Sequence, residues 1–99
     1  MLKEKIRREI LSWENIEEKP NRFGNMSFYV NNVELCHFHS EIQMDIRKPK
    51  KSLDDKRIAK NPYSTLFILF NFKTEKDILD MLALIKESYI EILNNNKNQ

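Results

Sequence analysis

Two histidines, His37 and His39, are the residues of this sequence best suited to chemistry, and they are its only histidines. They stand two positions apart in residues 33–39, a run whose composition is typical of a β-strand. Because side chains alternate along a strand, both imidazoles are expected on the same side of a sheet. A pair of neutral imidazoles can bind a metal, share a proton or grip a polar ligand, and it can equally be a hydrogen-bonded part of the fold. The spacing alone leaves these alternatives open.

A metal ion would need a third and usually a fourth ligand beside the two histidines. Asp45 could complete a two-histidine, one-carboxylate set if the intervening turn brings it to the same face. Cys36 is expected on the opposite face of the strand. Gly24 is the only glycine, so a glycine-rich phosphate loop is absent and the common nucleotide-binding enzymes are excluded. We therefore predict no metal site and no cofactor.

Residues 47–51 carry four cations around a proline, beginning with Arg47. Such a run can bind phosphate or carboxylate groups or touch a nucleic-acid backbone, and it can also be a solvated loop at a strand end. No aromatic residue interleaves it, and the chain has 17 basic and 15 acidic residues, a balance too even to indicate nucleic acid. Nucleic acid is therefore not the expected partner.

The length of 99 residues predicts one domain, residues 1–99, with a single modest core. No apolar run approaches the roughly 20 residues that cross a bilayer, and the charged N-terminus lacks the apolar part of an export signal. The single cysteine fits a reducing compartment. We expect a cytoplasmic protein with no membrane contact.

Hydrophobic spacing predicts an α+β domain with the order α-β-β-β-α-β-α. The predicted elements are residues 2–18, 26–30, 33–39, 42–47, 53–60, 65–72 and a helix from 74 onward, with a polar tail at 94–99 that we expect to fray. Ser52 and Thr74 each precede an aspartate by three positions, which is the spacing of a helix-capping box. Early hairpins favour a two-layer sandwich, in which a mainly antiparallel sheet of about four strands packs against helices.

The two-residue segment Asn31 and Asn32 is expected to form a hairpin turn, because asparagine tolerates left-handed backbone conformations. That turn would pair Phe28 with Leu35 across the hairpin. The histidines would then continue an apolar face of the sheet.

Residues 66–72 are apolar on both faces of their strand, whereas a two-layer monomer covers only one face. A helix could cross to the second face, or another copy of the chain could pack there. We expect the second arrangement, a homodimer.

From residue 33 onward, the sequence resembles the small domain family named for fungal luciferase. The segments that carry the resemblance are residues 34–39, 44–46, 59–62, 67–68 and 74–78, ending at Tyr89. The resemblance implies a compact α/β unit in which His37 and His39 line the site, and the fungal relatives are similar to oxygenases that act on an aromatic pyrone without an evident metal or flavin. This sequence departs from the family at two positions, with Asn61 where a histidine is common and Phe67 where a tryptophan is common.

We therefore expect a pocket around the histidines that binds a small aromatic or acidic molecule, with acid–base or metal-independent oxygenase chemistry. In this hypothesis His37 is the base and His39 donates a hydrogen bond to the ligand. Other residues expected at the site are Glu34 or Asp45, to orient a ring, Arg47, to hold an anionic group, and Asn61. The alternative is a homo-oligomeric interaction module without catalysis, in which the histidines are structural.

Overall fold

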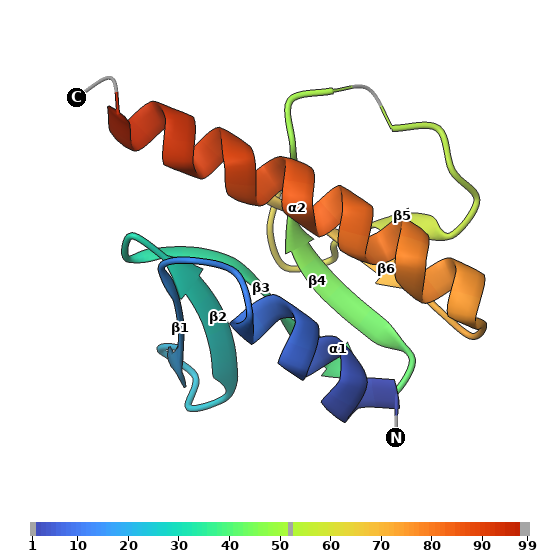
Figure 1. The fold of residues 1–99 in the computed structure, drawn as a ribbon. Coiled ribbons are helices and arrows are strands. Elements are labelled where there is room, and N and C mark those ends of the chain that lie inside the picture. Colours follow the sequence, from blue (N-terminus) through green and yellow to red (C-terminus); the bar gives the residue numbers. More distant parts are fainter. Residues whose placement is uncertain (1, 52, 98–99) are drawn as a thin grey trace.

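The computed structural model describes residues 2–51 and 53–97, without the side chains of residues 96 and 97. Two helices and six strands follow one another along this part of the chain: α1 (Leu2–Leu11), β1 (Ile16–Pro20), β2 (Met26–Val30), β3 (Val33–Ser40), β4 (Gln43–Arg47), β5 (Ile58–Lys60), β6 (Phe67–Asn71) and α2 (Glu75–Lys97). All strands pair antiparallel in one sheet of order β1-β2-β3-β4-β6-β5. Figure 1 shows both helices lying across the same face of this sheet. The α+β class and the antiparallel sheet are therefore confirmed, with six strands where about four were expected.

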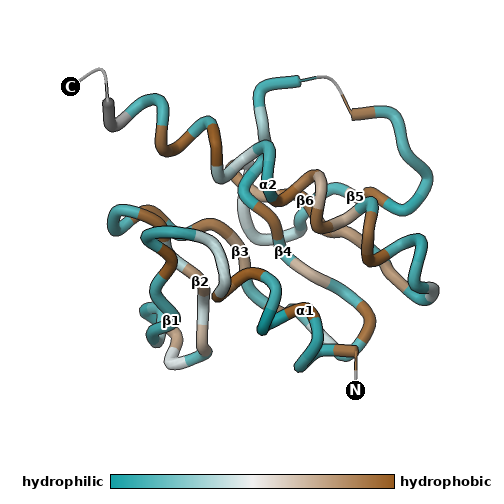
Figure 2. The backbone as a smooth tube through the Cα atoms, in the orientation of Figure 1, coloured by the Kyte–Doolittle hydropathy of each residue, from teal (hydrophilic) through white to brown (hydrophobic). Residues whose placement is uncertain are grey.

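The core lies between that face and the helices. Helix α1 contributes Ile6 and Ile10, which are one turn apart and fully buried. Helix α2 contributes a longer stripe, and the strands supply the apolar residues opposite. The buried core residues of α2 are Ile78, Met81, Leu84, Ile85, Tyr89 and Ile92, and those of the central strands include Phe28, Cys36, Met44, Ile46 and Phe70. Figure 2 shows the matching alternation of hydrophobic and hydrophilic positions along α2.

The start of α2 carries the predicted capping box. Thr74 Oγ1 accepts a hydrogen bond from the Asp77 backbone N–H at 3.1 Å, and Asp77 Oδ2 accepts one from the Thr74 N–H, also at 3.1 Å. These bonds satisfy backbone donors that a helix terminus leaves free. The corresponding prediction at Ser52 lies outside the described residues. The predicted tail is helical as far as Lys97, and residues 98–99 are not described.

The predicted helix over residues 2–18 is wrong beyond Leu11. The chain turns at Asn15, whose φ of 67° is left-handed, and Ile16 begins β1 by pairing with Val30. The Tyr89 hydroxyl fixes this turn by donating to the Glu14 carbonyl at 2.6 Å. Tertiary pairing thus overrides a helical apolar spacing that continued past the turn.

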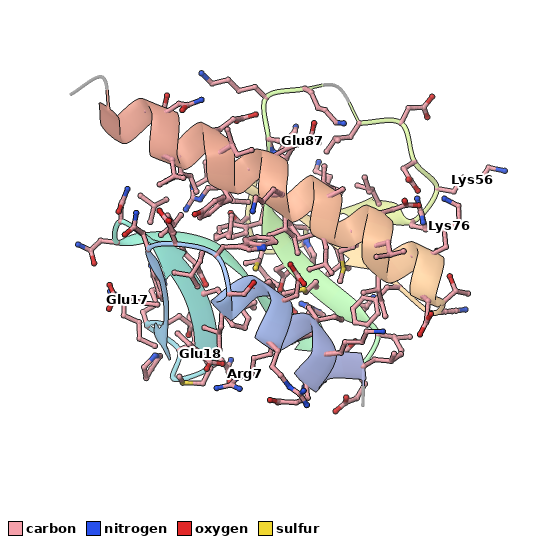
Figure 3. All side chains as sticks on the ribbon, in the orientation of Figure 1. Arg7, Glu17, Glu18, Lys56, Lys76 and Glu87 are labelled. Carbon is pink, nitrogen blue, oxygen red and sulfur yellow. The ribbon has the colours of Figure 1, made fainter. Side chains whose placement is uncertain are left out.

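Helix α1 and strand β1 are also joined by an ion pair. Arg7 Nη2 lies 2.8 Å from Glu18 Oε1, and Arg7 Nε donates to the same carboxylate at 2.9 Å. In Figure 3 the two side chains are seen between α1 and the strand. The contact holds β1, an edge strand, against the helical layer.

The predicted helix over residues 53–60 is also wrong. Asp55 accepts hydrogen bonds from the Arg57 backbone N–H and guanidinium, and this local turn competes with a helix. Residues Ile58–Lys60 then form β5, a short edge strand paired with β6. Among the described residues, no helix combines the length and apolarity needed to span a membrane.

Candidate functional site on the open face of the sheet

Both histidines lie on the face of the sheet away from the helices, so the prediction that they continue an apolar face is wrong. The hairpin turn is as expected, since Asn31 and Asn32 have φ of 50° and 67°. The register then shifts, because Phe28 pairs with Cys36 and not with Leu35. Leu35 is an extra residue in β3, a β-bulge that resets the alternation of side chains.

The bulge determines which side chains share a face. Leu35 and Cys36 are both fully buried on the core side, so His37 points to the opposite, open side. Glu34 and His37 are three residues apart and would face opposite ways in a regular strand. Instead the Glu34 carboxylate lies 3.0 Å from His37 Nδ1. One inserted residue thus brings a carboxylate and an imidazole together.

A second bulge places His39. Phe38 pairs with Met44 and Ser40 pairs with Gln43, which leaves His39 without a partner residue in β4. Its Nδ1 lies 2.9 Å from Asp45 Oδ2. Two irregularities in one strand therefore direct both histidines to the same carboxylate.

Asp45 is the centre of this cluster. Its Oδ2 lies 2.8 Å from His37 Nε2 and 2.9 Å from His39 Nδ1, while its Oδ1 accepts a hydrogen bond from the Asn61 amide. The Asp45 side chain is only 4% exposed. Burial alone would raise its pKa, but hydrogen bonds from the two histidines outweigh burial and hold the pKa of Asp45 below 3.8. Asp45 is therefore an anion held by three side chains.

His37 has a carboxylate at each ring nitrogen, Glu34 at Nδ1 and Asp45 at Nε2. A neutral imidazole donates from one nitrogen only, so two such contacts favour the imidazolium form. Burial opposes this charge, but the hydrogen bonds and charges of Asp45 and Glu34 outweigh it and raise the pKa of His37 above 6.5. His37 therefore favours its cationic form, with a carboxylate at each ring nitrogen.

The cluster extends toward β2 through Glu34. The Ser27 hydroxyl donates to Glu34 Oε2, and the Asn21 amide donates to Ser27 Oγ at 2.9 Å. Ser27 is fully buried, which is unusual for serine. Sequence reasoning missed both residues, and buried serine or asparagine carries no local pattern that would reveal them.

His39 differs from His37 because only one of its ring nitrogens is engaged. Its Nδ1 faces the Asp45 carboxylate and therefore carries the proton when the ring is neutral. Its Nε2 has no hydrogen-bond partner among the described residues and keeps a lone pair. The ring stacks on Tyr63, with centroids 6.5 Å apart, and the His39 side chain is 30% exposed. His39 thus keeps one ring nitrogen unengaged among the described residues, whereas His37 has both nitrogens engaged.

Arg47 and Phe67 form the other end of the site. The Arg47 guanidinium lies 5.0 Å from the centre of the Phe67 ring, and that ring lies 6.1 Å from the His37 ring. Arg47 Nε donates to the Glu34 carbonyl at 2.6 Å. Burial lowers the pKa of Arg47, which nevertheless stays cationic, as arginine does in proteins.

Asn61 is held in place by the loop that follows β5. It is 8% exposed, and its side-chain oxygen accepts a hydrogen bond from the Tyr63 backbone N–H at 2.8 Å. Its amide then donates to Asp45. Asn61 thus fixes the Asp45 carboxylate.

All the site residues that the sequence suggested lie on this open face or bond to it: Glu34, His37, His39, Asp45, Arg47 and Asn61. Their chemical roles stay predictions. Across residues 2–51 and 53–97, no three histidine, cysteine or acidic side chains are placed to hold a metal ion.

The predicted homodimer is not tested by a single chain. Leu69 points to the open face beside Asp45 and is only 9% exposed within one chain. That side of β6 therefore needs less cover than the sequence suggested.

Comparison with protein-family models, with curated proteins and with solved structures finds no match to this chain in any of the three. The resemblance to the fungal-luciferase family therefore stays a prediction from the residues that carry it.

Proposed function

We propose that the open face of the sheet binds a small molecule bearing an aromatic ring and an acidic group, and that His39 exchanges a proton with it. The observation that carries this proposal is the asymmetry of the two histidines around Asp45. Both ring nitrogens of His37 face carboxylates, whereas Nε2 of His39 is unengaged among the described residues. A carboxylate that orients a histidine in this way fixes its tautomer and supports an imidazolium that forms during proton transfer.

This proposal exchanges the roles that the sequence suggested. His37 in its protonated form would supply a positive charge beside the ligand, and His39 would be the general base or acid. The contacts support this assignment, because a base needs a lone pair that a substrate can reach. Asn61 would be a positioning residue, since it touches Asp45 rather than the ligand.

The flanking residues suggest the ligand class. Tyr63 is 86% exposed and stacks on His39, so its ring offers a surface for a second aromatic ring. Arg47 follows Asp45 by two residues and therefore lies about 7 Å farther along the same face. Its guanidinium would hold the carboxylate or other acidic group of the ligand. An oxygenase reaction, as the family resemblance implies, would begin with such a proton transfer.

The test is an NMR titration of the two histidine rings, followed by addition of simple aromatic acids such as salicylate and cinnamate. We expect the acid to shift the His39 ring signals, with little change in the His37 midpoint. Arg47→Gln should weaken binding by about 10-fold or more, because a charge-assisted hydrogen bond is lost.

Arg22→Gln is the matched control, since the Arg22 guanidinium stacks on Phe23 at 4.8 Å in a separate loop. It should leave the affinity unchanged. If the aromatic acids shift neither ring, or if both arginine variants weaken binding equally, the proposed function is wrong.

A further inference from the structure

A hollow lies beside Phe67, and it is lined by residues of the connection between β4 and β5, of β5 and of the loop before β6. Its volume is about 590 Å³, which is within the range of small-molecule sites. Leu53, Ile58 and Ile68 give it an apolar floor. Ser64 and Thr65, from the loop before β6, add hydroxyl groups at its rim. The hollow therefore combines an apolar base with polar groups, as ligand sites do.

The charges around this hollow have one sign. Four lysines line it, namely Lys48, Lys50, Lys51 and Lys60, and no acidic residue does so among the described residues. Lys51 is neutralised by Glu87, at 2.9 Å. The other three ammonium groups have no carboxylate within 4 Å in the described part of the chain. Three uncompensated cations around an apolar floor favour an anion with an apolar body.

The neighbouring hollow, of about 450 Å³, shows that this charge pattern is specific to one side. It lies between the same connection and α2, and acidic residues line it. Two of its aspartates, Asp55 and Asp80, are already paired with Arg57, at 2.6 Å and 3.0 Å. Glu87 is paired with Lys51, so Asp54 is the one acidic lining residue without a cation within 4 Å in the described part of the chain, against three such lysines in the other hollow.

We propose that the lysine-lined hollow binds a phosphate monoester with an apolar body. A phosphate monoester carries about two negative charges at neutral pH, which suits several lysine point charges better than a monoanionic carboxylate does. An apolar floor suits a single ring or a short chain. A nucleic acid is disfavoured because the lysines surround a hollow and do not spread along an extended track.

This inference is independent of the proposed function. The hollow and the histidine cluster share Phe67, whose ring contacts His37 and Arg47. The lysines, however, contribute nothing to the cluster around Asp45.

The test is a titration of the protein with 1-naphthyl phosphate, 1-naphthol and inorganic phosphate, followed by ¹H–¹⁵N NMR and calorimetry. We expect 1-naphthyl phosphate to shift the amides of Ile58, Lys60 and Thr65. The affinity for naphthol and for inorganic phosphate should each be lower by about 10-fold or more, because each lacks one half of the recognised group. Equal binding of all three compounds would overturn the proposal.

Charge reversal locates the site. The double variant Lys48→Glu, Lys60→Glu should weaken 1-naphthyl phosphate binding by about 10-fold or more. The control Lys56→Glu, Lys73→Glu makes the same change of net charge at exposed lysines that do not line the hollow, and Figure 3 shows Lys56 pointing away from the molecule. The control should keep the affinity.

Three results would contradict the proposal: equal weakening in both double variants, shifts confined to the histidine face, or tighter binding of a single-stranded oligonucleotide. If aromatic acids fail at the histidines while naphthyl phosphate shifts Lys60, the proposed function fails and this site stands.

Discussion

The two faces of the sheet are made by the same strands but hold their side chains in different ways. On the covered face, Cys36, Met44 and Phe70 pack against the helices and are almost fully buried. On the open face, His37 contacts the carboxylates of both Glu34 and Asp45. Within residues 2–51 and 53–97, no buried side-chain nitrogen or oxygen lacks a hydrogen-bond partner. The open face thus depends on a complete set of polar contacts, whereas the covered face depends on apolar area.

Neighbouring residues of one strand can lie in these two different environments. Cys36 and His37 are adjacent, yet one lies in the core and the other in a charged cluster. The bulge at Leu35 makes this division, because it decides which of the next residues face the helices.

The reactivity of cysteine should differ by about 1,000-fold or more between the faces. Burial raises the pKa of the Cys36 thiol well above its usual value, so the native protein should react with iodoacetamide only through rare opening. In the variant Cys36→Ala, His39→Cys, the thiol lies on the exposed side and should react quickly. Mass spectrometry measures both rates. Fast labelling of native Cys36 would mean that β3 has the opposite orientation.

Within β6, replacing a phenylalanine by alanine should cost more stability on the covered face than on the open face. Phe70→Ala should lower the free energy of unfolding by about 3–5 kcal/mol, because Phe70 is 1% exposed in the core. Phe67→Ala should cost less than half as much, since Phe67 is only partly buried on the open face. Urea denaturation gives both values. Equal losses would show that the open face is packed like a core.

Asp45→Asn should lower the free energy of unfolding by an amount that depends on pH and reaches about 1–3 kcal/mol. The raised pKa of His37 contributes stability below pH 6.5 that is lost as pH rises through the folded value. The lowered pKa of Asp45 contributes stability above pH 3.8 that is lost as pH falls through the folded value. The difference between the two proteins should therefore be largest near about pH 5–6 and smaller on either side. A cost that does not vary with pH would rule out a charged cluster.

The smallest effect is expected at Arg57, whose guanidinium meets Asp55, Asp77 and Asp80 near the start of α2. Hydrogen bonds from Arg57 lower the pKa of Asp55 to about 2. Because these groups are only partly buried, Arg57→Gln should lower the melting temperature only slightly. The difference should vanish in about 1 M salt, where charges are screened within about 3 Å. The loss of stability caused by Asp45→Asn should largely persist in the same salt. If salt removes it as well, the cluster around Asp45 is as open to screening as the cluster around Arg57.

Local signals explain which parts of the fold could be predicted from sequence. The turn at Asn31 and the cap at Thr74 depend on residues next to each other, so their chemistry is visible in the sequence. The helical spacing that ends at Ile16 gave a wrong helix, because pairing with Val30 decides that residue's conformation. Long-range pairing of this kind leaves no trace in a short window.

The site was predictable in its members but not in its arrangement. Alternation placed His37 and His39 on one face and allowed Asp45 to join them. The bulge at Leu35 was invisible, because Leu35 and Cys36 are both apolar and either could face the core. The different contacts of the two rings follow from that bulge, since it brings Glu34 to His37.

The strand order has a consequence for how the molecule opens. From β1 to β4 each strand pairs with its successor in the chain, whereas β5 attaches outside β6, at the edge of the sheet. Strand β5 has three residues and pairs on one side only, so it can detach while the other five strands stay paired. Its amides should exchange hydrogen before those of β3 and β4. A ligand held by Lys60 would slow that exchange, which makes the edge of the sheet a local reporter of what the protein has bound.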